Sequence, residues 1–367
     1  MYIRNFWYAA SWAHELSAER PLPMTIMDEP LVFFRDATGA ARALRDCCCH
    51  RNAPLSYGRC ENGRLRCMYH GLVFDGTGAC VLIPGQRHVP ATFRVPSYPT
   101  MEAGGFIWVW MGEATAADPS LIADRDAFDT TVWDMRTSWI DIDANYMLLN
   151  DNLSDMSHVA FVHEATFGGG DVRIAHTFPK MTSLECGIRA ERWLADRGVL
   201  EEWLPEEAGA AQPASRRLDQ WLAYDLLAPG YLVMRVEIYP AGAAQESAYL
   251  APKLNPVHAN LGVQAITPIS PSRTRYFFSL GPRHTETIEN PRLADEMFEV
   301  ALQAFAEDKR ILEAQQRNIA RWPLSQATAI KHDLALHMMR RKMEELIARD
   351  AAVDASPAPQ AASPVGR

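Results

Sequence analysis

Two stretches of sequence decide how this chain folds: Cys48-Cys49-His50-Arg51 and Cys67-Met68-Tyr69-His70-Gly71. Each pairs one cysteine with one histidine, in the spacings Cys-x-His and Cys-x-x-His. Two thiolates and two imidazoles on paired loops can hold a [2Fe–2S] cluster in which sulfur ligates one iron and nitrogen the other. The same residue types suit a tetrahedral zinc ion, but zinc fingers usually group two cysteines and then two histidines. The alternation therefore favours a mixed-ligand [2Fe–2S] cluster on Cys48, His50, Cys67 and His70.

Cys48 has cysteine neighbours on both sides, Cys47 and Cys49. Only Cys48 gives the Cys-x-His spacing, so we interpret its two neighbours as packing residues. Exchange of the ligand among the three is the alternative. The remaining cysteines, Cys60, Cys80 and Cys186, show no spacing typical of a disulfide framework.

The composition is that of an ordinary globular protein. The chain has 367 residues, 48% of them hydrophobic and 22% charged, enough for two domains with a large core. Its net charge of −9 argues against binding to nucleic acid or to an anionic membrane surface. No stretch approaches the ~20 apolar residues of a membrane span, and the start of the chain is too aromatic and polar for a signal peptide. We therefore expect a cytoplasmic protein that binds neither nucleic acid nor membrane.

The residue pattern of 1–115 is typical of a small β domain. Short runs of β-branched and aromatic residues precede turn signals, as where Leu31–Phe34 is followed by Thr38-Gly39. The run Phe106–Trp110 has the same character. Strands at this spacing predict an N-terminal β-sandwich.

The texture changes at about residue 116. An acidic, alanine-rich linker spans 112–126, and mixed segments follow it. Strand-like runs cover 230–238, 263–269 and 275–280, and helical patterns cover 146–160 and 291–350. Residues 351–367 are rich in alanine, proline and serine without periodicity, which predicts a disordered tail. The sequence thus predicts an α+β chain with a second domain over 116–350, and it contains no Gly-x-Gly-x-x-Gly motif for a dinucleotide.

A second group of potential metal-binding residues, His158 and His163 with Asp155 just before them, lies at and just beyond the end of the helical segment 146–160. Two histidines and one carboxylate on one face of a metal leave open positions opposite, which is the arrangement of non-haem Fe(II) oxygenases. His158 and His163 are five residues apart, which separates them by about 140° on an ideal helix. The helix must therefore loosen or break, for instance through a π-type turn, before both imidazoles reach one metal.

The third ligand must come from elsewhere, and helix periodicity suggests Asp308. The apolar stripe after residue 291 comprises Leu293, Met297, Val300, Ala301, Ala304, Phe305, Ile311 and Leu312. Asp308 falls on this stripe, where an isolated buried carboxylate is unfavourable unless it is paired or binds a metal. Glu307 is a competing candidate that falls off the stripe. An ion pair of Asp308 with Arg310 or Arg317, or a stripe that ends at Phe305, would explain the pattern without a metal.

In their order these features resemble the Rieske non-haem iron oxygenases over residues 1–345. The likeness is closer to the oxygenase components of the vanillate O-demethylase group, which includes dicamba monooxygenase. The shared segments are Asn5-Phe6-Trp7-Tyr8, Met68-Tyr69-His70-Gly71-Leu72, Ile83-Pro84-Gly85-Gln86, Phe106–Trp110 and Asp151-Asn152-Leu153-x-Asp155-x-x-His158. The segment Phe305–Lys309 matches the place where that subgroup supplies its carboxylate ligand, which favours Asp308.

The resemblance implies a Rieske β-sandwich over 1–115 and a helix-grip catalytic domain over 116–350, with a long helix against a curved antiparallel sheet. It implies a homotrimer in which the cluster of one subunit lies beside the mononuclear Fe(II) of its neighbour. That iron would be held by His158, His163 and Asp308. Asp155 matches the family's bridging aspartate, whose carboxylate would accept a hydrogen bond from a histidine of each site and link the two for electron transfer.

The resemblance also implies a reaction and its partners. A separate reductase with a flavin and a plant-type [2Fe–2S] cluster would supply electrons from NAD(P)H one at a time, and O2 would be the co-substrate. The expected substrate is a small methoxylated aromatic acid such as vanillate, whose O-methyl group is hydroxylated and lost as formaldehyde, leaving a phenol. The alternatives are an aryl-methyl hydroxylase or a ring-dihydroxylating dioxygenase of the same family, or an electron carrier that uses only the cluster.

The residues that bind the substrate are not evident from the sequence. Four basic or imidazole side chains between the metal ligands and residue 278 are candidates to meet an aromatic carboxylate: Arg173, His176, Arg235 and His258. Each of these residue types is more often structural or exposed at the surface.

Overall fold

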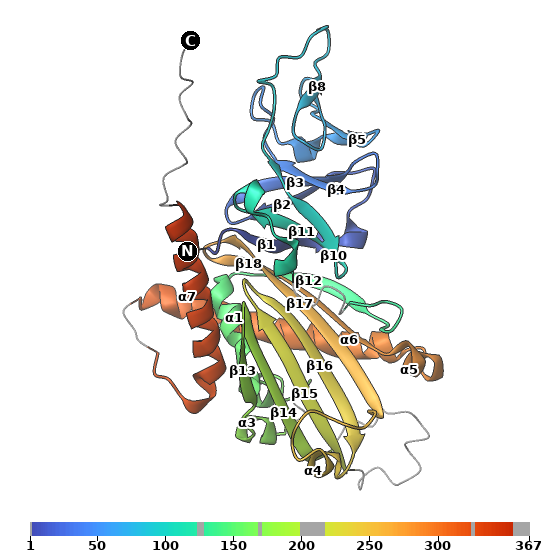
Figure 1. Cartoon of the computed structure of the whole chain (residues 1–367), viewed down its shortest axis with the longest axis vertical. Coiled ribbons are helices and arrows are strands. Elements are labelled where there is room, and N and C mark those ends of the chain that lie inside the picture. The colour runs from blue at the N-terminus through green and yellow to red at the C-terminus, as the bar shows by residue number, and fades with distance from the viewer. Residues whose placement is uncertain (1, 123–127, 168–170, 199–216, 324–326, 355–367) are drawn as a thin grey trace, which may run out of the picture.

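The computed structural model describes residues 2–122, 128–167, 171–198, 217–323 and 327–354 (Figure 1). Small β-sheets form one end of the molecule, and a large antiparallel sheet crossed by a long helix forms the other. No helix among these residues is both long and apolar enough to cross a membrane.

The N-terminal domain consists of three small sheets. Their strands, in sheet order, are β1 (Phe6–Trp12), β11 (Phe106–Met111) and β10 (Thr100–Ala103); β2 (Leu22–Ile26), β3 (Glu29–Arg35), β4 (Ala41–Arg45) and β9 (Ser97–Tyr98); and β5 (Arg59–Glu61), β6 (Arg64–Arg66), β7 (Val73–Phe74) and β8 (Cys80–Leu82). Short 3₁₀ turns connect or follow them: η1 (Ala13–Glu15), η2 (Leu55–Tyr57), η3 (Ala114–Ala116) and η4 (Pro119–Leu121).

The second domain is built on one seven-stranded antiparallel sheet. Its strands, in sheet order, are β12 (Arg136–Ile142), β18 (Arg273–Pro282), β17 (His258–Ser270), β16 (Tyr231–Pro240), β15 (Arg217–Leu227), β14 (Gly187–Gly198) and β13 (Lys180–Leu184). The helices and 3₁₀ turns are α1 (Tyr146–Ser154), η5 (Met156–His158), α2 (Val159–Val162), α3 (Arg173–His176), α4 (Ala243–Glu246), α5 (His284–Glu289), α6 (Leu293–Arg321), η9 (Lys331–Asp333) and α7 (Leu334–Asp354). Helix α6 packs on β18 and β12, and α7 packs on α1 and β14.

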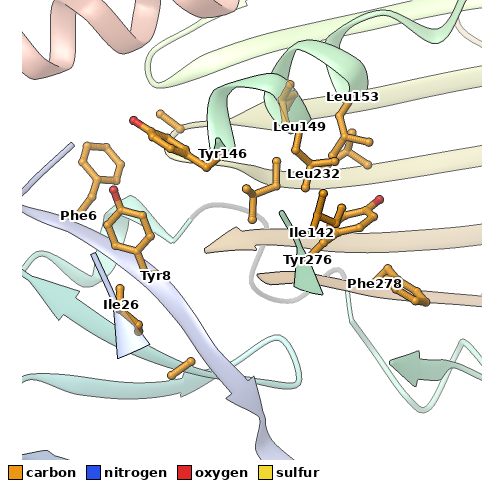
Figure 2. Packing of buried hydrophobic residues seen from close by; sticks show 14 of the residues in the cluster. Phe6, Tyr8, Ile26, Ile142, Tyr146, Leu149, Leu153, Leu232, Tyr276 and Phe278 are labelled. Carbon is orange, nitrogen blue, oxygen red and sulfur yellow. The ribbon is translucent and has the colours of Figure 1, made fainter. Parts of the chain in front are cut away.

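The two domains share their hydrophobic core. Strand β11 is buried along its whole length because its alternating side chains serve two different clusters. One cluster joins Phe6 and Tyr8 of the N-terminal domain to Tyr146 and Tyr276 of the second (Figure 2). Hydrogen bonds also cross the boundary, since the Thr267 hydroxyl donates to the carbonyl of Ala9 at 2.7 Å. The chain is therefore one packed body.

These elements confirm the α+β architecture that the sequence predicted, with a β-rich N-terminal domain and a helix against an antiparallel sheet. The expected strand-like runs 263–269 and 275–280 lie within β17 and β18, and the run 230–238 matches β16 from its second residue onward. The helical pattern over 291–350 is two helices, α6 and α7, rather than one. Helix α7 continues to Asp354, four residues into the predicted tail, and residues 355–367 lie outside the described residues. Part of the predicted linker, 123–127, also lies outside them.

Candidate metal centres

The two Cys/His stretches form a pair of matching loops. The first follows β4, and the second connects β6 to β7. In the first, the Cys48 carbonyl accepts from the Asn52 amide and the Cys48 amide donates to the Ala53 carbonyl; in the second, Cys67 makes the same two bonds with Gly71 and Leu72, all at 2.8–2.9 Å. Each loop is thus closed by its own backbone around a cysteine, which presents the two thiols side by side.

A positive φ angle turns each loop after its histidine. Asn52 has φ +55° and Gly71 has φ +75°. At position 71 glycine is required twice, because a Cβ atom there would also lie 2.9 Å from the Pro84 ring. The conformation that presents His70 therefore depends on Gly71 and on the close approach of Pro84.

The four predicted ligands lie as two pairs, the cysteines beside one another and the histidine rings beside one another. Cys48 and Cys67 are each only 1% exposed, whereas His50 and His70 are exposed and their ring centroids lie 4.5 Å apart. Burial and the neighbouring Cys67 thiol raise the pKa of Cys48 to about 12, so a bound cation is what would hold this sulfur as a thiolate. The Cys47 thiol instead faces the side-chain oxygen of Asn52 at 3.5 Å. Two buried sulfurs and two imidazoles on these two paired loops fit a mixed-ligand [2Fe–2S] cluster.

The second predicted site lies where the helical segment breaks. Helix α1 ends at Ser154, and Asp155 is extended (φ −115°, ψ 104°). The Asp155 carboxylate accepts from the Ser157 amide and thereby caps the 3₁₀ turn η5, after which α2 ends just before His163. Helix α1 is thus interrupted at Asp155, before both histidines, and from there to His163 the 3₁₀ turn η5 and the short helix α2 take the place of the π-type turn.

His158 and His163 both lie beside helix α6, with their side chains facing Asp308 of that helix. The three side chains offer ligand atoms that all lie within 4.8 Å of one another. The Asp308 carboxylate is 3.6 Å from His158 Nε2 and 3.3 Å from His163 Nε2. Asp308 and His163 are each 2% exposed. Asp308 thus lies on the buried stripe of α6 as predicted.

The Nδ1 atom of each imidazole makes a hydrogen bond on the side away from Asp308. His163 Nδ1 donates to Glu307 Oε2 at 2.8 Å, and the Thr166 hydroxyl donates to the same oxygen at 2.9 Å. His158 Nδ1 donates to the backbone carbonyl of Asp155. Both Nε2 atoms consequently point toward Asp308 with their lone pairs available, which is the arrangement that metal-binding histidines require.

The pKa values of the two histidines are shifted in opposite directions. Burial lowers the pKa of His158, and the Asp308 carboxylate offsets only part of this change. Burial also acts to lower the pKa of His163, but Asp308 and Glu307 outweigh it and the pKa is raised. Two imidazoles and one carboxylate, converging in a buried place with their outer nitrogens occupied, fit a 2-His-1-carboxylate iron site.

Asp155 touches His158 in a different way from the one the resemblance implied. Its backbone carbonyl, not its carboxylate, accepts from His158 Nδ1. The carboxylate oxygens accept from the Ser157 amide at 2.8 Å and the Ser157 hydroxyl at 2.7 Å. Within one chain the carboxylate therefore shapes the turn that carries His158.

Two side chains near this site received no such role from the sequence. Asn152 Nδ2 donates to Asp308 Oδ1 at 3.0 Å, while its buried Oδ1 has no hydrogen-bond partner among the described residues. The sequence feature that could have indicated this role is a polar amide side chain in a helical segment that otherwise carries Leu148, Leu149 and Leu153. Glu307, weighed as a ligand, instead orients a ligand, and a carboxylate next to Asp308 was its signal.

A cavity of about 290 Å³ opens beside His158, His163 and Asp308. Its apolar walls comprise Leu153, Met156, Val159, Phe167, Ile174, Leu222, Met234, Val236, Ile238, Leu280, Met297 and Phe305. The polar side chains that line it, besides the three candidate ligands, are Asp171, Arg197, Gln220, His258, Asn260, Gln264 and Ser279. A mostly apolar chamber with a few polar groups beside a metal site suits a small aromatic molecule.

Of the four candidate anchors, only His258 lines this cavity within the described residues. Arg173 is bound to Asp171 at 2.7 Å and to backbone carbonyls of β14. His176 is exposed. Arg235 alternates along β16 with Met234 and Val236, which line the cavity, so it points to the other face of the sheet.

The fold and the two sites define the class. A β domain with paired Cys/His loops precedes an antiparallel sheet and helix that bring together two histidines and an aspartate, as in Rieske oxygenases. The family profile "Rieske [2Fe-2S] domain" matches residues 6–99, and "Vanillate O-demethylase oxygenase C-terminal domain" matches residues 142–349, more than half of the chain. The chain belongs to the Rieske non-haem iron oxygenases of the vanillate O-demethylase oxygenase family.

Relatives match over nearly the whole chain. The iron-sulfur subunit of the toluene-4-sulfonate monooxygenase system of Comamonas testosteroni is 31% identical over 350 residues, 95% of this chain and 97% of its own. The vanillate O-demethylase oxygenase subunit of Pseudomonas sp. HR199 is 31% identical over 355 residues, 95% of this chain and 96% of its own. A crystal structure of dicamba monooxygenase with non-heme iron and dicamba has a TM-score of 0.77 at 29% identity, covering 96% of this chain and 99% of that one.

The family supplies the general activity. The chain is an oxidoreductase, the oxygenase component of a multicomponent monooxygenase, with a Rieske [2Fe–2S] cluster and a non-haem iron as cofactors. An oxygenase component of this kind works with a reductase.

Proposed function

We propose that Cys48, His50, Cys67 and His70 hold the [2Fe–2S] cluster in a domain over residues 1–115. In the domain over 116–350, His158, His163 and Asp308 hold the mononuclear Fe(II). When bound, these groups supply stored electrons and the activation of O2. The observation that carries the proposal is the apolar cavity that opens directly beside the His158–His163–Asp308 group.

The substrate we propose is a small methoxylated aromatic acid of the vanillate type. Hydroxylation of its O-methyl carbon consumes one O2, two electrons and two protons, and releases one water. The resulting hemiacetal breaks its bond between the methyl carbon and the aryl oxygen, giving formaldehyde and a phenol. The protein's part is to exclude bulk water with its apolar walls and to hold the methyl group toward the metal ligands.

A single-turnover experiment tests this reaction. The chemically reduced holoenzyme is mixed with vanillate and O2, and formaldehyde and phenol are quantified. We expect formaldehyde and phenol in a ratio of about one to one, with no dihydrodiol, because both products come from the same bond cleavage. A dihydrodiol without formaldehyde would contradict the proposal and indicate ring dihydroxylation.

A second candidate is hydroxylation of an aryl methyl group, and the toluene-4-sulfonate relative favours it. The same C–H hydroxylation at a carbon bound to the ring gives a stable benzylic alcohol instead of a hemiacetal. Toluene-4-sulfonate in the single-turnover assay would then yield 4-(hydroxymethyl)benzenesulfonate. That product, together with inactivity on every methoxybenzoate, would replace the O-demethylase proposal by this one.

We also propose the partners. The reductase would contain a flavin and a plant-type [2Fe–2S] cluster and use NAD(P)H, which places both components in the cytoplasm. The sheet that carries the second cluster loop, β5-β6-β7-β8, lies at the far end of the molecule from α3 (Figure 1). Ile174 of α3 lines the cavity. This separation supports a homotrimer in which one subunit's cluster serves the neighbouring subunit's iron. Asp155 is the proposed inter-site electron bridge.

Glu307 is a positioning residue in this proposal, because it holds His163 Nδ1. Its replacement by alanine should weaken Fe(II) binding by about 10- to 100-fold, since the ring loses the contact that fixes its tautomer and orientation. The measurement is Fe(II) affinity by competition with a chelator. Glu307→Gln, which keeps an acceptor oxygen, should lose less. An unchanged affinity in Glu307→Ala would show that Thr166 and the backbone orient His163 without this carboxylate.

A further inference from the structure

One polar atom in the cavity wall has no partner. His258 opens β17, lines the cavity and is 2% exposed. Its Nδ1 atom is bound to Glu286 Oε2, and the other carboxylate oxygen accepts from the Ala259 amide at 3.1 Å. Its Nε2 atom is buried and makes no hydrogen bond among the described residues. A buried imidazole nitrogen without a partner is unfavourable, which indicates that something else binds it.

Charged and polar groups of the wall are engaged with other side chains. Arg197 is 3.2 Å from Asp171 and donates to Gln220, so its charge is compensated within the protein. Gln264 Oε1 accepts from the Tyr276 hydroxyl at 2.7 Å. Among the described residues that line the cavity, only His258 has a fully buried side-chain nitrogen or oxygen without a hydrogen bond.

The chemistry of the pair suggests an acid as that ligand. A carboxylate can only accept, so Nδ1 of His258 carries a proton toward Glu286. The Glu286 side chain is only 10% exposed and holds its carboxylate against Nδ1 on the side away from the vacant nitrogen. An anionic oxygen bound at Nε2 would favour a proton on that nitrogen, and Nε2–H would then be a charge-assisted donor that matches a carboxylate or sulfonate.

We propose that His258 Nε2, supported by Glu286, is the anchor for the acid group of the substrate. This inference rests on the proposed function, since His258 lines the same cavity as His158, His163 and Asp308. A ring held between the anchor and those ligands lies against apolar walls. The anchor then selects aromatic acids over neutral analogues, because a neutral group leaves the buried charged pair without its partner.

The test compares acids with neutral analogues of the same shape. Dissociation constants are measured by calorimetry on the anaerobic holoenzyme for vanillate and vanillamide, and for toluene-4-sulfonate and its sulfonamide. His258→Gln should weaken binding of the acids by roughly 10- to 100-fold and change binding of the amides by less than about threefold. Glu286→Gln keeps an acceptor for Nδ1 but removes the charge, so the acids should weaken in the same direction by less.

His176→Gln is the matched control, because this histidine is exposed and outside the cavity wall. Each variant is compared with the wild type in cluster absorbance and iron content, so that misfolding is detected independently. An unchanged ratio of acid to amide affinity in both His258→Gln and Glu286→Gln, with vanillate still converted by the wild type, would overturn the anchor alone. Failure of the wild type to bind either acid would overturn the proposed substrate class as well. Selective loss of the amides would make His258 an anchor for neutral groups.

Discussion

Replacing Asp308 by alanine should remove the mononuclear iron and leave the cluster in place. The carboxylate is the only acid among the three converging ligands, and it is 2% exposed, so no water or neighbouring acid can easily substitute for it. We expect the iron content to fall from about three to about two per chain, and turnover to fall by at least ~1000-fold, since O2 activation depends on that metal. Iron analysis and the visible spectrum measure the two sites separately.

Glu299→Ala is the control, because Glu299 is exposed on the opposite side of the same helix. It should keep all the iron and the activity. If Asp308→Ala retained about three irons per chain, the carboxylate ligand would have to be another residue, and the double variant with Glu307→Ala would test the nearest one.

Replacing Cys48 by alanine should abolish the visible absorption of the cluster and all turnover. The Cys48 sulfur is buried against Cys67, so its loss leaves one iron with a single thiolate in a place where water cannot replace the ligand. We expect iron to fall to at most about one per chain, which is the share of the mononuclear site. Absorption spectroscopy and iron analysis check the result.

Cys49→Ala tests the alternative that ligands exchange. Cys49 is exposed, and the neighbouring Cys47 faces Asn52. Cys49→Ala and Cys47→Ala should therefore each keep the cluster spectrum. A normal spectrum in Cys48→Ala, lost only when Cys47 or Cys49 is removed as well, would assign the ligand to a neighbour.

The sequence predicted those features that depend on local spacing. Cys-x-His and Cys-x-x-His placed four ligands in two loops, and the loops converge. Periodicity placed Asp308 on the buried stripe of α6 because a helix repeats regularly over a long segment. It also predicted that the helix must loosen or break before both imidazoles reach one metal, since His158 and His163 point apart on an ideal helix.

What the sequence could not predict depends on contacts between distant segments. The break is at Asp155 because its side chain caps the next turn, which competes locally with continuing the helix. The partner of His163 Nδ1 comes from a residue 144 positions away, and the partner of His258 from the next helix beyond two strands. Strand β15 gave no clear periodic signal, because it is buried on both faces and burial of this kind removes the alternation on which strand prediction relies.

The continuous core described between the domains has a mechanical consequence. A hinge motion would have to expose Phe6 and Tyr8 to water together with their partners Tyr146 and Tyr276, at a cost of about 1.5–3 kcal/mol for each large side chain. It would also break the Thr267–Ala9 hydrogen bond. The N-terminal domain and the second domain therefore move as one rigid unit. The distance from the two Cys/His loops to the cavity is therefore set when the protein folds and does not change by domain motion.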